Sequence, residues 1–592
     1  MSEAPYTLVR ARRVHTLADT GTEADAFVVA GDRILAVGDR RDLRALHPAA
    51  EPVDLGDGVV VPGLHDAHVH PTAIADESFQ VDLSACTTPE EVAAALRDRA
   101  EATGAGSWVL ATRYDHGKST GGRVLDRDDL DRICPSWPVL VMHIAGHWAV
   151  ANTRALELAG LTDHSVPPTG GSYGRDDAGR LNGVLYERTM APFAVGGGLV
   201  PEPDLAGRLT ALGAFLGKLN AAGLTSLCDT DVSPRGLRLL QEARDRGLLT
   251  ARVGVLVNHD FFAAERDLGL RTGFGDATLR FVGVKPFLDG AVGGGTCLLE
   301  QPYEDGGGHG QQVLGERELE RVLTVHEAGC RLAVHANGDR AIRLLLDAFE
   351  RLQKASGRPV AGHRSEHCSL VDDEILARMR ALGLIAVPFG SHVAFHGEKL
   401  SGYYGDRLSR MFAHRSLLDA GIAVAGSSDY PCGPYEPLLA LQSCVTRQTA
   451  RGEVLGGEQR ITAAGALRLY TTGAALACGE ERDKGRIAPG FLADFTVLAD
   501  DPLRVPADQL SALPVTSTWL CGRQVWPRPC DLPTFRQEFR HDTQHTQDPR
   551  HAMCVGRARP GDGGRLQRRP VGHRVRHRQG RRAGRRHACC QG

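Results

Sequence analysis

The chain has 592 residues, of which 42% are hydrophobic and 24% are charged, and its formal net charge is −3. A chain of this length is expected to fold into two or three domains. The near-neutral charge argues against nucleic acid as a partner of the core, and the apolar runs are too short to cross a bilayer, which argues against a membrane protein.

The cysteines and the N-terminus favour a cytoplasmic location. The 14 cysteines include no Cys-x-x-Cys pair, which is typical of reduced thiols rather than of a disulfide framework. The first residues contain no basic segment followed by an apolar stretch, so no signal peptide is predicted.

Residues 1–58 and 480–530 have the same pattern of short strands and turns. Residues 7–11, 26–30 and 33–37 are predicted strands, with a hairpin turn at residues 30–32. Strand-turn-strand patterns return at residues 484–498 and 515–526. Neither piece can bury much alone, so we expect the two ends of the core chain to form one small β-sandwich.

Between these ends, residues 59–479 alternate strands with helices. Residues 279–285 and 330–335 are predicted strands, and residues 316–328 and 340–353 are predicted helices. Repeated units of this kind predict the α/β fold class, specifically a parallel (β/α)8 TIM-like barrel. The region is longer than a minimal barrel, and we expect an insertion at about residues 83–202 to cover the barrel mouth.

The last segment, residues 531–592, differs in composition from the rest. From Arg550 onward it holds thirteen arginines and one aspartate, and few aliphatic residues, so it is predicted to be a basic, disordered tail. One interpretation is a basic nucleic-acid-binding arm. The interpretation that we prefer is a shifted reading frame in GC-rich DNA, which produces Arg, Gly, Ala and Pro.

Metal-binding side chains follow five of the predicted strands. His68 and His70 come after an apolar run, and residues two apart on a strand point to the same face. Further candidates are Lys285, His335, His367 and Asp429, listed here in chain order. Because the carboxyl ends of barrel strands meet at one mouth, and imidazole is a common metal ligand, the pattern predicts a metal site there.

This ordered set of motifs resembles the amidohydrolase superfamily. The residues around these motifs look like its YtcJ-like branch, amidohydrolase family 3, which includes N-substituted formamide deformylase. The matching segments are residues 62–70, 285–290, 335–341, 366–367 and 427–431, with a late match at residues 485–494. The resemblance covers roughly residues 6 to 530 and leaves the tail out.

The resemblance implies a role for each metal-site residue. His68 and His70 would hold the more buried ion, His335 and His367 a second ion, and Asp429 would bind metal and transfer protons as the catalytic residue. The expected cofactor is a divalent metal, zinc in the first place, with one or two ions per chain.

The role of Lys285 has two alternatives. Carboxylated Lys285 would bridge two ions, whereas an unmodified Lys285 would pair with Asp289 or with a substrate carboxylate. Glu187 is a rival metal-site carboxylate, and its use would favour a single ion.

Two further residues are predicted to bind substrate. His147 lies in a segment that resembles one reaching the active site in the family, although Ala145 stands where an Asp is expected. Asp289 is followed by a glycine-rich stretch typical of an active-site loop.

The resemblance implies a metal-dependent hydrolase that cleaves carbon–nitrogen bonds other than peptide bonds in a small amide-like substrate. The alternatives are a metal-dependent isomerase or deaminase on the same scaffold, or a non-catalytic barrel. A serine nucleophile is disfavoured, because the Gly-x-Ser-x-Gly match at residues 170–174 lies in a predicted loop. A homodimer is the default expectation for the assembly.

Overall fold

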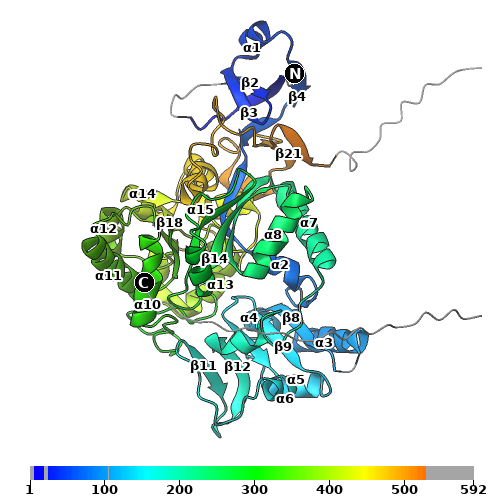
Figure 1. Ribbon diagram of the computed structural model, residues 1–592, viewed down its shortest axis with the longest axis vertical. Coiled ribbons are helices and arrows are strands. Elements are labelled where there is room, and N and C mark those ends of the chain that lie inside the picture. Colours follow the sequence, from blue (N-terminus) through cyan, green and yellow to red (C-terminus); the bar gives the residue numbers. More distant parts are fainter. Residues whose placement is uncertain (1–5, 19–23, 105, 529–592) are drawn as a thin grey trace, which may run out of the picture. The chain divides into compact units, whose positions relative to one another are not determined.

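The computed structural model describes residues 6–18, 24–104 and 106–528 (Figure 1). The predicted tail, residues 531–592, lies outside these ranges. The described chain mixes helices and strands and fits a TIM-barrel-like fold. Within it, every helix is too short or too polar to cross a membrane.

Strands from both ends of the chain share one eight-stranded sheet. Its order is β22-β21-β20-β5-β1-β2-β3, with β4 paired to β1. The N-terminal and C-terminal parts meet where β5 runs antiparallel to β20, with Val60 opposite Val497. Two-layer sandwich packing stays a prediction. The strands are β1 (Thr7–Val14), β2 (Ala24–Ala30), β3 (Arg33–Gly38), β4 (Glu51–Asp54), β5 (Val59–Pro62), β20 (Phe495–Leu498), β21 (Val515–Leu520) and β22 (Arg523–Trp526).

Eight further strands form two parallel sheets of four strands each. The sheets have the orders β15-β14-β13-β6 and β16-β17-β18-β19. A parallel bridge between Val284 and Leu332 joins β15 to β16, and the Asp429 N–H donates to the His68 carbonyl on the other side. The strands are β6 (Leu64–Val69), β13 (Leu224–Val232), β14 (Arg252–Asn258), β15 (Leu279–Lys285), β16 (Ala333–Ala336), β17 (Arg364–His367), β18 (Ile385–Val387) and β19 (Ala423–Val424).

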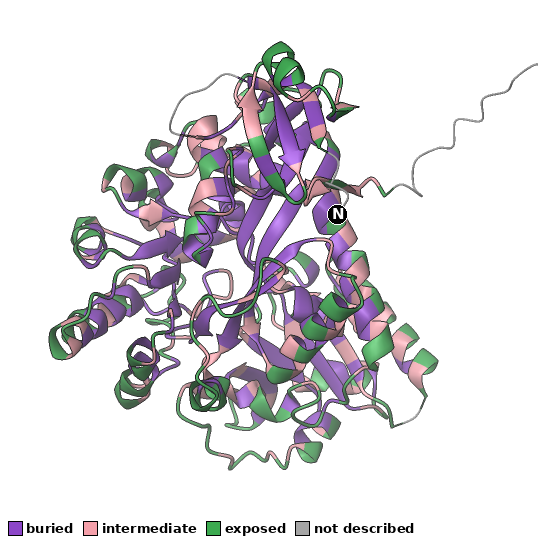
Figure 2. Cartoon of the chain, turned by 45° about the horizontal axis from the view of Figure 1, so that its top comes forward, coloured by how far each residue is buried: buried purple, intermediate pink, exposed green. Residues whose placement is uncertain are grey.

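Helices alternate with these strands and bury one face each (Figure 2). In α11, Ala341, Leu345 and Leu352 recur at helical spacing and are buried, and Gly357 ends the helix in the left-handed conformation that glycine favours. The helices are α1 (Arg40–Leu46), α2 (Pro71–Glu77), α7 (Leu205–Ala221), α8 (Pro234–Asp245), α9 (Phe262–Asp267), α10 (Glu316–Glu327), α11 (Asp339–Ser356), α12 (Asp373–Leu382), α13 (His392–Tyr404), α14 (His414–Asp419), α15 (Pro437–Thr446), α16 (Ala463–Arg468) and α17 (Ala474–Cys478).

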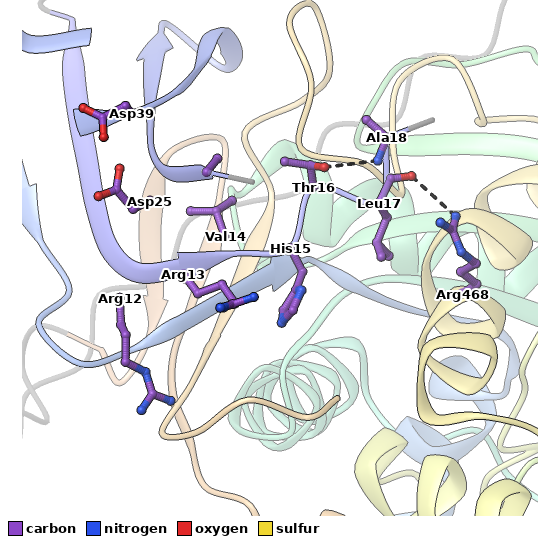
Figure 3. A pocket seen from close by; sticks show the side chains of 11 residues that line it. Arg12, Arg13, Val14, His15, Thr16, Leu17, Ala18, Asp25, Asp39 and Arg468 are labelled. Carbon is purple, nitrogen blue, oxygen red and sulfur yellow. Dashed lines mark hydrogen bonds between the residues drawn. The ribbon is translucent and has the colours of Figure 1, made fainter. Parts of the chain in front are cut away.

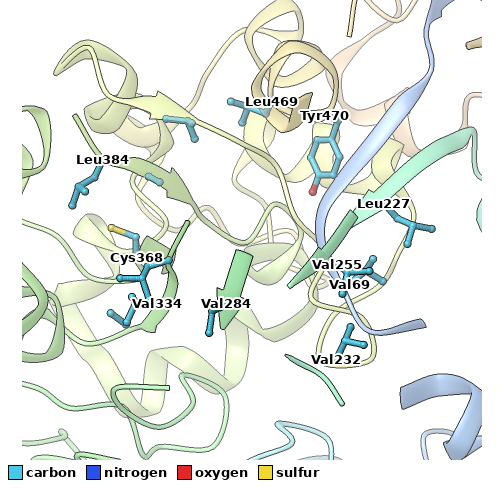
Figure 4. Close-up of a cluster of buried hydrophobic side chains, with 14 of the residues drawn as sticks. Val69, Leu227, Val232, Val255, Val284, Val334, Cys368, Leu384, Leu469 and Tyr470 are labelled. Carbon is cyan, nitrogen blue, oxygen red and sulfur yellow. The ribbon is translucent and has the colours of Figure 1, made fainter. Parts of the chain in front are cut away.

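The largest hydrophobic cluster packs the parallel strands against their helices. Val69, Val255, Val284 and Val334 come from four different strands, and all four are almost fully buried (Figure 4). Burying side chains of this size contributes about 1.5–3 kcal/mol each. These strands are therefore a rigid support for the side chains at their ends.

A fourth sheet lies mostly within the predicted insertion. It has six strands in the order β11-β12-β10-β9-β8-β7 and its own cluster of buried side chains. Its elements are β7 (Val81–Asp82), α3 (Pro89–Thr103), β8 (Val109–Tyr114), α4 (His116–Ser119), α5 (Arg127–Ile133), β9 (Val139–His143), β10 (Trp148–Ala151), α6 (Thr153–Leu158), β11 (Gly171–Arg175) and β12 (Leu181–Glu187), followed by the 3-10 helix η1 (Arg188–Phe193).

The predicted loop at residues 170–174 is wrong, because β11 is the edge strand of this sheet. Its backbone pairs with β12, with Ser172 opposite Tyr186. The local residues are glycine-rich and carry no strand pattern, so the pairing partner decides the conformation. A nucleophile elbow is still excluded, because β11 leads to β12 rather than to a helix.

Candidate metal centre

The six predicted metal-site residues come together at the carboxyl ends of the parallel strands. Nε2 of His70 lies 2.9 Å from Oδ1 of Asp429, and Nε2 of His68 lies 3.2 Å from the same oxygen. Nζ of Lys285 is 3.4 Å from Nε2 of His68. The His367 ring centroid lies 4.7 Å from that of His68 and 4.6 Å from that of His335.

Buried acceptors orient both histidines of the first strand. Nδ1 of His68 lies 2.5 Å from Oε2 of Glu366, and Glu366 is held by two 2.7 Å bonds from Arg364. Nδ1 of His70 lies 2.9 Å from the Thr230 carbonyl. A proton on each Nδ1 satisfies these acceptors, and each Nε2 faces Asp429, where it would be free to ligate a metal ion once one is bound.

The pKa values of the carboxyl groups and of the lysine at this centre are shifted from their usual values. Burial alone would raise the pKa of Asp429, but His68 and His70 hold it well below its usual range. Burial opposes ionisation of Glu366 as well, yet Arg364 and His68 lower its pKa to about 2. Burial lowers the pKa of Lys285. Both carboxylates are therefore ionised at neutral pH.

His335 and His367 present their rings without a charge. Burial holds the pKa of each well below the usual value for histidine. Nε2 of His335 lies 3.0 Å from the Gly290 carbonyl, so a proton there leaves Nδ1 unprotonated. Nδ1 of His367 is buried and has no hydrogen-bond partner within the described part of the chain. Neutral imidazoles of this kind are suited to metal ligation.

Asp289 lies beneath the centre rather than in its cavity. Its carboxylate is fully buried and accepts backbone N–H bonds of 2.9 Å from Leu298, Asn337 and Gly338. Burial raises the pKa of Asp289 to about 7. This placement favours a role in fixing the loop after β15 and the start of α11 over the predicted contact with substrate.

His147 and Glu187 belong to the insertion and line the cavity into which the metal-site residues point. Nδ1 of His147 lies 2.9 and 3.0 Å from the two Glu187 oxygens, and its ring centroid is 4.9 Å from that of His335. Burial disfavours a charged His147, but Glu187 outweighs it and raises its pKa. Both line the cavity together with Lys285 and Asp429.

The donor set at this centre fits a divalent metal. Nε2 of His68, Nε2 of His70 and a carboxylate oxygen of Asp429 lie within 4.8 Å of one another. The unpartnered Nδ1 of His367 is a further buried donor without another role. Imidazole nitrogens with a carboxylate, each imidazole oriented by a second group, are the ligands that zinc and related ions prefer.

A second cluster of residues that could bind a metal consists of Asp115, His116 and His143, and its polar atoms have partners within the protein. Nδ1 of His143 accepts from the Ala145 N–H, so Nε2 carries the proton and donates to Nδ1 of His116 at 3.3 Å. Nζ of Lys399 lies 3.2 Å from Asp115. Because these groups neutralise one another, we assign no metal to this cluster.

A cavity of about 500 Å³ lies between the sheet of the chain ends and α16 (Figure 3). It is lined by Arg12, His15 and Arg468, among other residues. None of the predicted site residues is among the described residues lining it, and residues 19–23, next to Ala18, are not described. We assign no ligand to it.

Sequence analysis missed Glu366 and Arg364. They alternate on β17, so both side chains lie on the same face of the strand. An Arg-x-Glu pair inside an apolar barrel, with the glutamate adjacent to His367, is the signal that could have revealed them. Buried charges of this kind persist only when paired.

Comparison with known proteins gives one consistent match. A model described as the amidohydrolase family matches residues 51–526, and one described as an imidazolonepropionase-like composite domain of bacteria matches residues 26–50. The chain is 30% identical over 531 residues to a Bacillus subtilis (strain 168) protein described as amidohydrolase YtcJ, covering 87% of this chain and 98% of that protein. It is 29% identical over 527 residues to N-substituted formamide deformylase of Arthrobacter pascens, covering 86% and 96%.

A solved structure supports the same match. A metal-dependent hydrolase of Pyrococcus horikoshii OT3 superposes with a TM-score of 0.67 and 25% identity, covering 85% of this chain and 99% of that chain.

Proposed function

The chain belongs to amidohydrolase family 3, within the metal-dependent hydrolases, and from this premise we propose that it hydrolyses a carbon–nitrogen bond of a small amide-like substrate. The observation that carries the proposal is the cluster of His68, His70 and Asp429, in which one potential ligand atom of each residue lies within 4.8 Å of the others. The deformylase relative acts on an N-substituted formamide by its name, which supports the same bond type.

We assign the metal site to these three residues together with His335 and His367. His68, His70 and Asp429 would hold one ion, and His335 and His367 would hold a second. When bound, a divalent ion supplies Lewis acidity, which lowers the pKa of a coordinated water toward 7 and polarises a carbonyl oxygen. Zinc as the ion, a cytoplasmic location and a homodimer stay predictions.

Asp429 is the proposed proton carrier. It is ionised, so it accepts the proton that the attacking water loses, and it returns this proton to the leaving nitrogen. Proton return is required because an amide nitrogen cannot leave as an anion. His147, with Nδ1 held by Glu187, is placed to donate from Nε2 to the substrate.

Lys285 is proposed to bridge two ions as a carbamate. Its amine is buried 3.4 Å from His68, and burial favours the neutral amine that captures CO2. Glu187 is the rival bridging carboxylate, but its oxygens lie against Nδ1 of His147. This contact supports Lys285 over Glu187.

Elemental analysis together with turnover tests the proposal. Protein purified without added metal or chelator is analysed for metal content and assayed on a panel of N-formyl and N-acyl amines, with product analysis to separate hydrolysis from isomerisation. About two ions per chain would support the carbamate bridge. About one ion would favour a mononuclear site. No metal, with no activity restored by added metal, would refute the proposal.

Asp429→Asn is expected to keep the fold but to lose about 10²–10⁴-fold in kcat. The matched control is Asp115→Asn, in the second cluster, which should retain both metal content and turnover. Near wild-type turnover in Asp429→Asn would remove Asp429 from the mechanism.

A further inference from the structure

The metal centre lies at the floor of a cavity much larger than an amide group. The cavity has a volume of about 560 Å³ and includes His70, Lys285, His335 and Asp429 in its lining. At about 30 Å³ per water molecule, this volume corresponds to about nineteen waters. A formamide group alone would leave most of this space to solvent.

The insertion contributes an apolar surface to the cavity, beside its polar lining residues Thr112, His147, Glu187 and Arg188. It is built by the strand residues Leu110 and Leu140, by Met142, and by Met190, Phe193, Val195 and Val200 from the segment after β12. These residues belong to one hydrophobic cluster of the insertion. Leu110, Met142, Met190 and Val195 are only partly buried, so they retain apolar surface for the cavity.

The opposite wall, contributed by the barrel, is polar but already engaged. Arg235 pairs with Asp76 at 2.5 Å, and the Asn258 amide donates to Asp231 at 2.5 Å. These two pairs use part of the polar groups of this wall, whereas Nη1 of Arg235 has no hydrogen-bond partner among the described residues. The surface of the cavity is nevertheless mostly apolar, so a ligand above the metal centre would mainly contact the apolar surface of the insertion.

We propose that this wall is the specificity site for an apolar substituent on the amide substrate, which the cavity of about 560 Å³ accommodates. The inference rests on the proposed function, because it places the scissile amide at the metal centre. Met142 and Met190 are the proposed specificity-determining residues. Methionine is flexible and adapts to apolar groups of different shape.

Two substrate series test the proposal. N-alkylformamides from methyl to octyl, and N-methyl amides from acetyl to octanoyl, are compared by kcat/KM on the full chain as purified. In at least one series kcat/KM is expected to rise about fourfold per methylene until the cavity is filled. A kcat/KM that does not change with chain length in either series would overturn the proposal.

Substitutions of Met142 and Met190 test whether this wall binds the apolar substituent of the substrate. The double variant Met142→Gln/Met190→Gln is expected to lose about tenfold or more in kcat/KM for the longest substrate and less than about twofold for the shortest. Met142→Leu/Met190→Leu should restore the chain-length dependence. The control is Leu161→Gln, which alters the same hydrophobic cluster at a residue outside the cavity lining and should behave as wild type.

A binding measurement separates this inference from the proposed function. Calorimetric titration with octylamine and butylamine requires no turnover. Tighter binding of octylamine, lost in the Gln double variant, would support the apolar site even if no amide is hydrolysed, in which case only the proposed function fails. Equal affinities for the two amines would overturn the inference even if short formamides are substrates.

Discussion

Glu187 is the residue whose surroundings most restrict its role. The antiparallel register of β10 and β12 pairs Trp148 with Tyr186, which brings Glu187 opposite His147. The Glu187 N–H donates to the His147 carbonyl, while its carboxylate holds the ring of the same residue. Its backbone has a φ of 53°, a region costly for a residue other than glycine. A strained residue with two bonds to one partner is suited to positioning that partner.

Glu187→Gln is expected to lower kcat/KM by about 10- to 100-fold, because His147 loses its charged partner and a strong hydrogen bond. The metal content should stay at the wild-type value. The lost carboxylate no longer raises the pKa of His147, so any protonated form required for activity should be lost at lower pH than in the wild type. The measurements are elemental analysis and a pH profile of kcat/KM.

A fall in metal content in Glu187→Gln would instead identify Glu187 as a ligand. His147→Gln serves as the paired variant. If the two residues act as a unit, their effects on kcat/KM should not add in the double variant.

At the scale of single elements, α9 carries an uncompensated buried carboxyl. Glu265 is 8% exposed, and its Oε2 has no hydrogen-bond partner among the described residues. Burial raises the pKa of Glu265 to about 7. The ionised Glu265 carboxylate therefore destabilises the folded state, and protonation of the carboxylate removes this destabilisation.

Glu265→Gln is expected to stabilise the protein at pH 8 by about 1–3 kcal/mol. The folded pKa lies above the unfolded one, so wild-type stability falls as pH rises from about 4.5 to 7. The gain should shrink toward pH 5, where the wild-type carboxyl is largely protonated. Denaturant unfolding at both pH values measures it, with the exposed Glu320→Gln on α10 as control. An equal gain at both pH values would contradict the burial argument.

Local sequence patterns predicted several elements but not their partners. The strand predicted at residues 7–11 is part of β1, and the helix predicted at residues 340–353 lies within α11. By contrast, β11 was predicted as a loop, since its strand conformation depends on pairing with β12. The same limit applied to the site: the metal-site histidines follow a local pattern, whereas the contact of His147 with Glu187 spans forty residues and depends on strand register.

At the scale of the whole molecule, the ends of the chain depend on each other. A chain that stops after Arg528 retains every described strand and is expected to unfold at the wild-type temperature with its metal content intact. A chain that stops after Asp494 lacks β20–β22, leaves β5 without its antiparallel partner, and is expected to show no cooperative unfolding. Thermal unfolding of both chains tests this, and a cooperative transition in the shorter one would show that the shared sheet is dispensable.

The pairing of β5 with β20 cannot form until most of the chain has been synthesised. About 430 residues separate Pro62 from Phe495, its partner in the sheet. At about 5–20 residues per second, a ribosome needs roughly 20–90 s to make the second strand after the first. During that interval the fully apolar β5 has left the exit tunnel with one of its edges open. The nascent chain is therefore expected to carry an unpaired apolar strand edge, at which wrong pairing can begin, until translation is nearly finished.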